Sequence, residues 1–282
     1  MVAADLMIYD QRIGRSSRSA DRPLRRSGRL KTGAAMGLVD YFKDKDYVLT
    51  PCEGLDQLIL MEMYSQGIFP MASEKRPGYL ILGCPRQRAL FDLNEIKISR
   101  SMVKFLRSCP GRYQVRINTR KQEIVENCRN IPRKDGDGWI GEDFPRLYAS
   151  MPNFVSAGVF NQEDELVGGL YGLCVGRIFC GESMFSRESN TSKLAFYAFV
   201  LHCRRHGFRY IDSQILNDHT ASLGCREYPR KFFRKLLAKW GQAWPETSFK
   251  EPGVIFPDPA GGVEEQIREL VSIGRPRQEA GN

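Results

Sequence analysis

The chain has 282 residues, of which 42% are apolar and 11% aromatic, enough to bury one large core or two modest ones. Its formal net charge is +9, but the first 35 residues supply eight bases against three acids. The remaining excess of about +4 permits a polyanionic partner without requiring one. No run approaches the ~20 apolar residues of a membrane span, and the start lacks the order of a secretory signal, so we expect a soluble protein without a membrane partner.

Residues 1–35 are rich in Arg and Ser and predict a disordered basic tail, because this composition cannot bury a core. An organelle transit sequence and an RNA-binding arm stay open as alternatives. A third is a wrongly chosen start codon, with Met36 as the true start.

Eight cysteines are scattered along the chain without a C-x-x-C pair, which indicates reduced thiols in a reducing compartment. His202 and His206 are four residues apart, but no third ligand accompanies them, and a solvated helix end explains them better. We therefore expect a cytoplasmic protein with no metal and no cofactor.

In the first half, residues 53–66 predict a helix that ends at Gly67. A strand at 89–93 and a helix at 99–108 follow, then a strand at 113–118, a helix at 121–129 and a glycine-rich loop at 135–141 that presents Trp139. These elements favour a small N-terminal α/β module over residues 36–145.

From residue 146 the pattern changes to three strands, 155–160, 166–174 and 177–183, expected to form an antiparallel meander. An apolar helix at 190–206, a strand at 208–214 and a helical stretch within 221–240 complete this part. The order predicts an α+β domain with a mixed sheet over 146–245, which would fit the acyl-CoA N-acyltransferase architecture. We expect residues 246–282 to be a C-terminal extension.

Residues 179–186 place Glu182 between a glycine and apolar residues at a strand end. A carboxylate there is costly to bury without a partner. One interpretation is that Glu182 faces a cleft and holds a cation such as an α-amino group. The other is a carboxylate that caps the turn into the next helix.

Residues 210–224 bring Asp212 and Gln214 to one face of a strand, if the alternation is regular. The two side chains could then bond each other, and an amide held in this way can position an amine during acyl transfer. A polar ladder at a strand end is the alternative. A Cys180–His219 nucleophile pair is a weaker hypothesis, because Cys180 lies in an apolar run.

Together these segments resemble the leucyl/phenylalanyl-tRNA-protein transferase family over about residues 55–240. The resemblance also rests on the segments 64–70, 98–101, 139–140 and 165–172. It implies an aminoacyltransferase that moves an amino acid from charged tRNA to the N-terminal α-amine of an acceptor protein and so marks that protein for N-degron proteolysis. It also implies an acyl-CoA N-acyltransferase-like fold without coenzyme A.

The resemblance assigns expected roles to individual residues. Glu182 and Gln214 match the active-site glutamate and amide, with Asp212 as the orienting carboxylate of Gln214. Trp139 matches an aromatic residue that stacks on the terminal adenosine of tRNA. The basic helix that meets the acceptor-stem phosphates carries Arg100, Lys104 and Arg107. The pocket for the transferred side chain would be lined by Leu170, Phe179, Phe196, Phe199, Cys203 and Ile211.

The chain departs from the family pattern at Met71 and Leu82, where the family has tryptophans, and at Phe196 and Cys203, which differ in volume from the usual residues. Such changes alter which side chain fits a pocket, so arginyl or leucyl transfer to acidic N-termini stays an alternative to a Leu- or Phe-like donor. A non-catalytic tRNA-binding protein is a second alternative. An acyl-CoA N-acyltransferase is a third, although residues 165–195 lack its pyrophosphate-binding loop.

Overall fold

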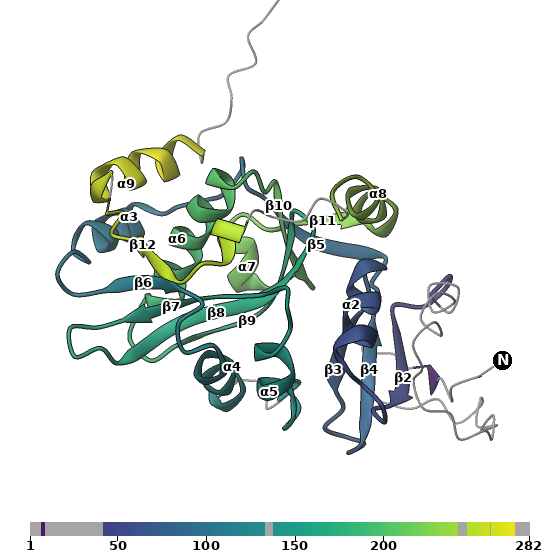
Figure 1. Cartoon of the computed structure of the whole chain (residues 1–282). Coiled ribbons are helices and arrows are strands. Elements are labelled where there is room, and N and C mark those ends of the chain that lie inside the picture. The colour runs from purple at the N-terminus through teal and green to yellow at the C-terminus, as the bar shows by residue number, and fades with distance from the viewer. Residues whose placement is uncertain (1–6, 9–41, 133–137, 242–246, 260, 274–282) are drawn as a thin grey trace, which may run out of the picture.

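The computed structural model describes residues 7–8, 42–132, 138–241, 247–259 and 261–273. It contains an eight-stranded sheet and a four-stranded sheet, which lie beside each other with the helices packed around them (Figure 1). Apart from residues 7–8, the predicted basic tail lies outside the described residues.

The eight-stranded sheet has the order β11-β5-β10-β9-β8-β7-β6-β12. Only β9 and β10 pair in parallel among these strands, and every other neighbouring pair is antiparallel. The predicted mixed sheet and the β7-β8-β9 meander are therefore confirmed. The bounds are β5 Gln87–Asp92, β6 Gln114–Ile117, β7 Phe154–Phe160, β8 Leu166–Val175, β9 Ile178–Ser186, β10 Tyr210–Gln214, β11 Arg226–Pro229 and β12 Gly253–Phe256.

Helices cover both faces of this sheet. The apolar helix α6, Thr191–Arg205, lies on one face with α3, Arg100–Arg107, and α9, Gly262–Ile273, while α4, Lys121–Asn130, and α5, Phe144–Ala149, lie on the other (Figure 1). All residues of β7 and β8 are buried as a result, which explains why these strands read as continuous apolar runs rather than as alternating ones.

The four-stranded sheet has the order β1-β2-β4-β3, with β1 Met7–Ile8, β2 Tyr47–Pro51, β3 Phe69–Ala72 and β4 Tyr79–Gly83. Its helix α2, Gln57–Ser65, begins where the Asp56 carboxylate accepts a hydrogen bond from the backbone N–H of Ile59. Gly67 has a φ of +78°, and its conformation turns the chain from α2 into β3. This small sheet was not predicted as a sheet.

The predicted helical stretch within 221–240 is confirmed as α8, Arg230–Trp240, but the residues just before α8 are not part of that helix. The chain forms a short helix, α7 Asp218–Ser222, then β11, and only then α8. Gly224 adopts a φ of +106° that a side chain rarely takes, so the backbone leaves α7 there and joins the edge of the sheet.

The eight-stranded sheet also takes strands from both sides of residues 145 and 245, so the division of the chain into domains stays a prediction. Within the described ranges, no helix is both long enough and apolar enough to cross a membrane.

The prediction of a solvated helix end is wrong for His202. Its imidazole is 9% exposed, stacks on Phe249 at 4.8 Å between ring centroids, and bonds through Nε2 to the Phe249 carbonyl at 2.9 Å. The segment of short helix and strand after residue 247 therefore covers the end of α6.

Candidate active site

Two β-bulges on neighbouring strands aim the two central polar side chains. In the β8–β9 ladder, Tyr171 pairs with Ser183 and Gly172 with Gly181, so Glu182 is the extra residue of a bulge. In the β10–β5 ladder the register shifts between Asp212 and Gln214, and Gln214 has a φ of +62°. Bulges re-aim side chains and are common beside active sites.

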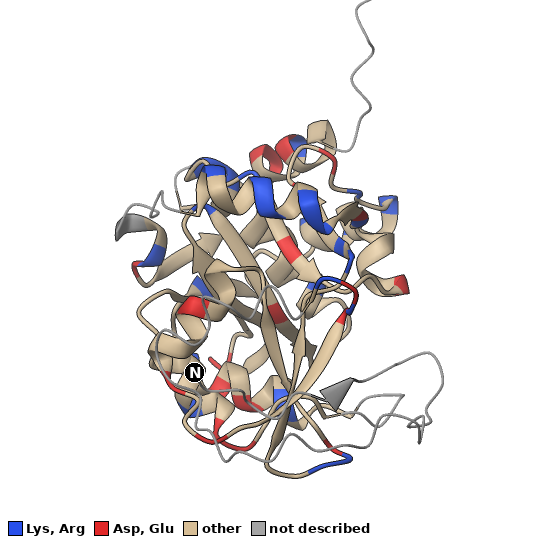
Figure 2. Ribbon diagram, turned by 90° about the vertical axis from the view of Figure 1, so that its right-hand side faces the viewer, with Lys and Arg blue, Asp and Glu red and all other residues tan. Residues whose placement is uncertain are grey.

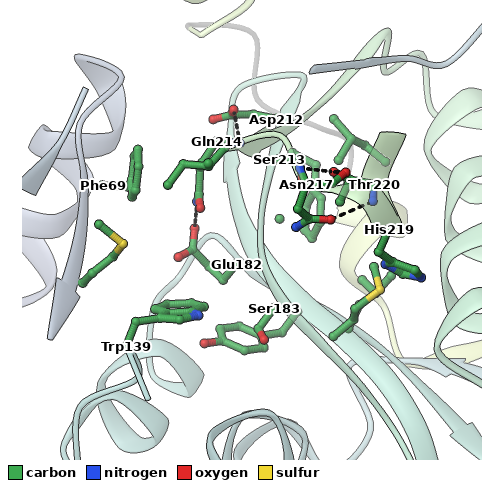
Figure 3. Close-up of a pocket in the computed structure, with 18 of the residues that line it drawn as sticks. Phe69, Trp139, Glu182, Ser183, Asp212, Ser213, Gln214, Asn217, His219 and Thr220 are labelled. Carbon is green, nitrogen blue, oxygen red and sulfur yellow. Dashed lines mark hydrogen bonds between the residues drawn. The ribbon is translucent and has the colours of Figure 1, made fainter. Parts of the chain in front are cut away.

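Glu182 and Gln214 meet in the space that these bulges open. The Gln214 amide Nε2 donates to Glu182 Oε1 at 2.7 Å, as Figure 3 shows. Both side chains are buried, at 7% and 8% exposure. The parallel ladder of β9 with β10 ends at Cys180 and Asp212, so the two strands stop pairing just before this contact.

Burial raises the pKa of Glu182 to about 8, and the nearby Asp212 carboxylate raises it as well, while hydrogen bonds from Tyr64 and Gln214 act against the rise. The carboxyl group therefore carries a proton at neutral pH when the cavity holds no cation. A cation bound beside it would favour the ionised form.

Two buried tyrosines support the other side of the Glu182 carboxyl group. The Tyr64 hydroxyl from α2 and the Tyr148 hydroxyl from α5 lie 2.9 Å apart, and the Tyr148 hydroxyl donates to Glu182 Oε2 at 3.5 Å. Both residues are at most 1% exposed, and burial raises the pKa of each phenol well above its usual value. They therefore remain neutral hydrogen-bond donors.

The suggested bond between the Asp212 and Gln214 side chains is not formed, and Asp212 contacts the Gln214 backbone instead. Its carboxylate accepts two bonds from Arg88, at 2.7 and 2.6 Å, and a third from the backbone N–H of Gln214 at 2.9 Å. Asp212 thus fixes the left-handed backbone of Gln214, while the Gln214 amide points to Glu182. A short polar side chain that bonds backbone two residues ahead is well suited to this.

Arg88 is 1% exposed and joins the two sheets. Its guanidinium donates to the Gly67 carbonyl at 3.0 Å and lies 4.8 Å from the Phe69 ring and 4.6 Å from the Phe233 ring. The planar fork of arginine suits this bidentate and stacked position.

A cavity of about 440 Å³ surrounds the Glu182–Gln214 pair, a size that suits a small-molecule group. Five of the six residues predicted to hold the transferred side chain line it: Leu170, Phe179, Phe196, Phe199 and Ile211. The sixth, Cys203, is fully buried in the same core and is not part of the lining. Phe91 and Met184 extend the apolar wall.

The cavity has an aromatic side and a polar side. Trp139 lines it together with Phe69 and Met71, and Figure 3 shows Phe69 and Trp139 across from Asn217 and His219. The Trp139 carbonyl accepts from the backbone N–H of Ala72 at 2.8 Å, which ties the tryptophan to β3. Residues 135–137 of the predicted glycine-rich loop lie outside the described residues.

The three predicted phosphate-binding bases lie on α3 and are exposed. Arg107 forms an ion pair with Glu264 of α9 at 2.9 Å, so its charge is already balanced. Arg100 and Lys104 have no ion-pair partner within the described ranges.

The burial of Cys180 argues against the hypothesis of a Cys180–His219 nucleophile pair. Cys180 is 1% exposed, and burial together with the Asp212 charge raises the pKa of its thiol well above its usual value. The reactive thiolate is therefore disfavoured. All eight cysteines lie in described positions, and none of them forms a disulfide. Among the described residues, no group of three or more potential ligands could hold a metal.

The sequence predicted no role for Arg88, Tyr64 or Tyr148. Arg88 directly precedes the predicted strand at 89–93, and an arginine entering an apolar strand is a signal of a buried charge that needs a partner. Tyr148 carried no such signal, because an isolated tyrosine on a helix is ordinary. Tyr64 begins the segment 64–70, but the resemblance assigned it no role.

Two comparisons of the sequence with known proteins agree with each other. A family model described as leucyl/phenylalanyl-tRNA protein transferase matches residues 90–238. The leucyl/phenylalanyl-tRNA–protein transferase of Yersinia enterocolitica is 44% identical over 183 residues, which cover 64% of this chain and 75% of the relative. The protein of the same name from Yersinia pestis strain Pestoides F is 42% identical over the same shares.

Among solved structures, L-PGS from Bacillus licheniformis aligns with 83% of this chain and 88% of its own, at 11% identity and a TM-score of 0.34. That likeness is too low to define the fold. The family model, in contrast, spans more than half of the chain and includes both bulges. The chain therefore belongs to the leucyl/phenylalanyl-tRNA–protein transferase family.

Proposed function

We propose that this protein transfers an amino acid from an aminoacyl-tRNA to the N-terminal α-amine of an acceptor protein or peptide, and so marks it for degradation. The observation that carries the proposal is the Glu182–Gln214 contact of 2.7 Å inside a cavity with an apolar wall, in a chain of this family. The donor and acceptor belong to the cytoplasm, where we place the activity.

The reaction is aminolysis of an activated ester. The amine nitrogen attacks the ester carbonyl carbon, the bond to the ribose oxygen breaks, and a proton of the amine ends on that oxygen. No nucleotide hydrolysis is needed, since the ester is already activated, so positioning of the two substrates can supply much of the acceleration.

Each central side chain has a role in this positioning. Glu182 takes the α-ammonium group of the donor, which replaces the proton that the carboxyl carries in the free protein. The amide Nε2 of Gln214 is used by Glu182, so its Oε1 is left to accept a hydrogen bond from the attacking amine. Asp212 holds the backbone of Gln214.

The cavity wall favours an apolar donor side chain. The residues proposed to surround that side chain are Leu170, Phe179, Phe196, Phe199 and Ile211, and none of them is a carboxylate that could take a guanidinium. Trp139 is placed to stack on the terminal adenosine. The unpairing of β9 from β10 supports an acyl-CoA N-acyltransferase-like arrangement of the larger sheet, with the smaller sheet as an N-terminal module.

The test is a set of charged tRNAs offered with peptides that begin with Arg, Lys, Asp or Glu. We expect transfer from leucyl- or phenylalanyl-tRNA, and we expect Glu182→Ala and Gln214→Ala each to lower kcat/KM by about 100-fold or more. The control is the exposed pair Gln122 and Glu126 on α4, which has the same 2.7 Å contact away from the cavity.

Full activity of both cavity variants would remove these residues from the mechanism. Binding of tRNA without transfer from any charged species would favour the non-catalytic alternative. Transfer from arginyl-tRNA alone would contradict the assigned donor.

A further inference from the structure

Helix α8 is amphipathic, and its inner face anchors it firmly. Phe233, Leu236 and Leu237 are buried, and the Phe233 ring packs on the Arg88 guanidinium. A Cβ at Gly67 would touch both Phe233 and Leu237. The helix is therefore a rigid element of the body and holds its outer face in a fixed place.

The outer face of α8 is strongly basic. The helix carries five bases and no acid, and four of the bases are exposed at helical spacings of three and four residues. We call this set the α8 cationic face: Lys231, Arg234, Lys235 and Lys239. Figure 2 looks onto this side of the molecule and shows the basic residues as blue bands along the helix.

These four charges are not balanced by acids of the protein. In the part of the chain that the structure describes, no carboxylate lies within ion-pair distance of any of them. The fifth base, Arg230, is different, because it bonds Asp46 at 3.1 Å and backbone carbonyls of the N-terminal segment. Like charges on one helix face repel each other, so a face of this kind costs stability unless a polyanion binds it.

The α8 cationic face carries more positive charges without an ion-pair partner than α3 does. One of the three bases on α3, Arg107, is balanced by Glu264, which leaves two free charges there against four on α8. The two helices also lie on different sides of the molecule (Figure 1), so a ligand of α8 would not simply extend a contact with α3.

A membrane surface fits this face poorly. Helices that bind membranes place apolar residues among the bases and insert them into the lipid. On α8 the other exposed residue between the bases is Ala238. Phe233, Leu236 and Leu237 are buried, and Phe232 stacks on the ring of Tyr228. The phosphate backbone of a nucleic acid needs no insertion and is recognised by such a row of bases.

We propose that the α8 cationic face binds the phosphate backbone of tRNA, away from the 3′ end that enters the cavity. The identity of the RNA rests on the proposed function, whereas the recognition of a phosphate backbone rests on the charges of α8. This face adds affinity for the body of the tRNA without taking part in chemistry.

The test measures binding of uncharged tRNA to the full chain by fluorescence anisotropy at several salt concentrations. The variant combines Lys231→Ala, Arg234→Ala, Lys235→Ala and Lys239→Ala, which keep helix propensity at exposed positions. We expect the Kd at 0.15 M salt to rise roughly tenfold or more. The slope of log K against log salt should become shallower by roughly 0.7 to 0.9 for each phosphate that the variant no longer neutralises.

A smaller pair of variants supplies the matched control. Lys231→Ala with Lys235→Ala and Arg112→Ala with Arg129→Ala remove the same net charge from exposed positions, but only the first pair lies on α8. We expect the first pair to weaken tRNA binding and the second to leave it within about twofold. Equal losses of affinity in both pairs would reduce the effect to net charge and overturn the proposal.

Two further measurements separate this inference from the proposed function. With a short aminoacylated donor that carries only the terminal adenosine, the fourfold variant should keep the wild-type transfer rate, because the donor cannot reach α8. Unchanged tRNA binding by the fourfold variant would overturn the inference even if transfer is observed. Loss of binding to vesicles of phosphatidylcholine and phosphatidylserine, with tRNA binding unaffected, would assign the face to a membrane instead.

Discussion

At the scale of single residues, the site depends on a carboxyl group that the fold keeps protonated. Glu182 is surrounded by Gln214, two tyrosine hydroxyls and the more distant Arg88–Asp212 pair. A neutral acid can be buried at little cost, and near neutral pH a cation bound beside it favours the ionised form. The raised pKa of Glu182 therefore makes this position selective for a ligand that carries an ammonium group.

The raised pKa of Glu182 predicts a definite pH dependence of stability. Its pKa is about 8 in the folded protein against an ordinary value of 4.5, so the folded state binds more protons between these values. The contribution of Glu182 to stability is therefore full below pH 4.5 and is lost as the pH rises through 8. In Glu182→Gln this loss should disappear. The pH-dependent changes in the stability of the two proteins should therefore differ by a few kcal/mol, at about 1.36 kcal/mol per pKa unit.

Urea unfolding of the wild type and Glu182→Gln at pH 5, 7 and 8.5 measures the effect. His202 contributes with the opposite sign, because burial lowers its pKa to about 4 and its contribution is lost as the pH falls from 6.5 through 4. The difference between the two proteins removes that contribution. Parallel pH curves for the two proteins would show that Glu182 ionises normally in the folded state.

At the scale of elements, the sequence predicted regular strands and helices but did not predict the bulges. The apolar runs of β7 and β8 and the helix α6 were found because burial on both faces leaves a continuous signal. The regular alternation assumed for 210–214 was wrong, since the register shifts after Asp212. No periodicity marks a single inserted residue.

The residues of the candidate site were likewise predicted only in part. Glu182, Gln214 and most of the apolar wall were predicted, largely through the resemblance to the family, and the cavity brings them together. Arg88 and the two tyrosines come from β5, α2 and α5, far from both motifs in sequence. Their proximity is a property of the packing of two sheets, and local patterns carry no information about it.

The bulge at Glu182 predicts that Gly172 cannot be replaced. A Cβ at Gly172 would overlap the carbonyl oxygen of Cys180 and the ring of Phe179, so Gly172→Ala must displace the bulged strand. We expect a loss of about 3 kcal/mol, the upper part of the range for overpacking, together with loss of transfer. Denaturant unfolding measures the first effect.

Gly181, the partner of Gly172 in the ladder, is the matched control. A Cβ there would meet its neighbours at 3.5 Å or more, which is ordinary contact, so Gly181→Ala should keep nearly the wild-type stability. Equal losses of stability for the two variants would mean that the strand, and not the bulge, is sensitive to a methyl group.

At the scale of the whole molecule, the cavity depends on the contact between the two sheets. Residues of β3 and β4 line it together with residues of β8, β9 and β10, and Arg88 spans the junction. Its guanidinium binds Asp212 behind Gln214 and the Gly67 carbonyl after α2. The buried Arg88–Asp212 pair thus fixes the backbone of Gln214, and Arg88 also fixes the position of the small sheet through Gly67.

Removal of Arg88 should therefore be costly in a way that a second change can partly repair. Arg88→Met leaves the Asp212 carboxylate, which is 0% exposed, without its counter-charge, and we expect a loss of about 3 to 5 kcal/mol. Adding Asp212→Leu removes the stranded charge and should restore part of that stability, but not transfer, because Gln214 then loses the acceptor that holds its backbone.

Unfolding by urea and transfer assays on the single and double variants check this, with Arg86→Ala as the control. Arg86 forms an ion pair with Asp46 but is 65% exposed in its side chain, so its removal should cost less than about 1 kcal/mol. If the double variant were less stable than Arg88→Met, the buried charge would not be the source of the loss. The contacts of Arg88 with Phe69, Phe233 and Gly67 would then be what holds the two sheets together.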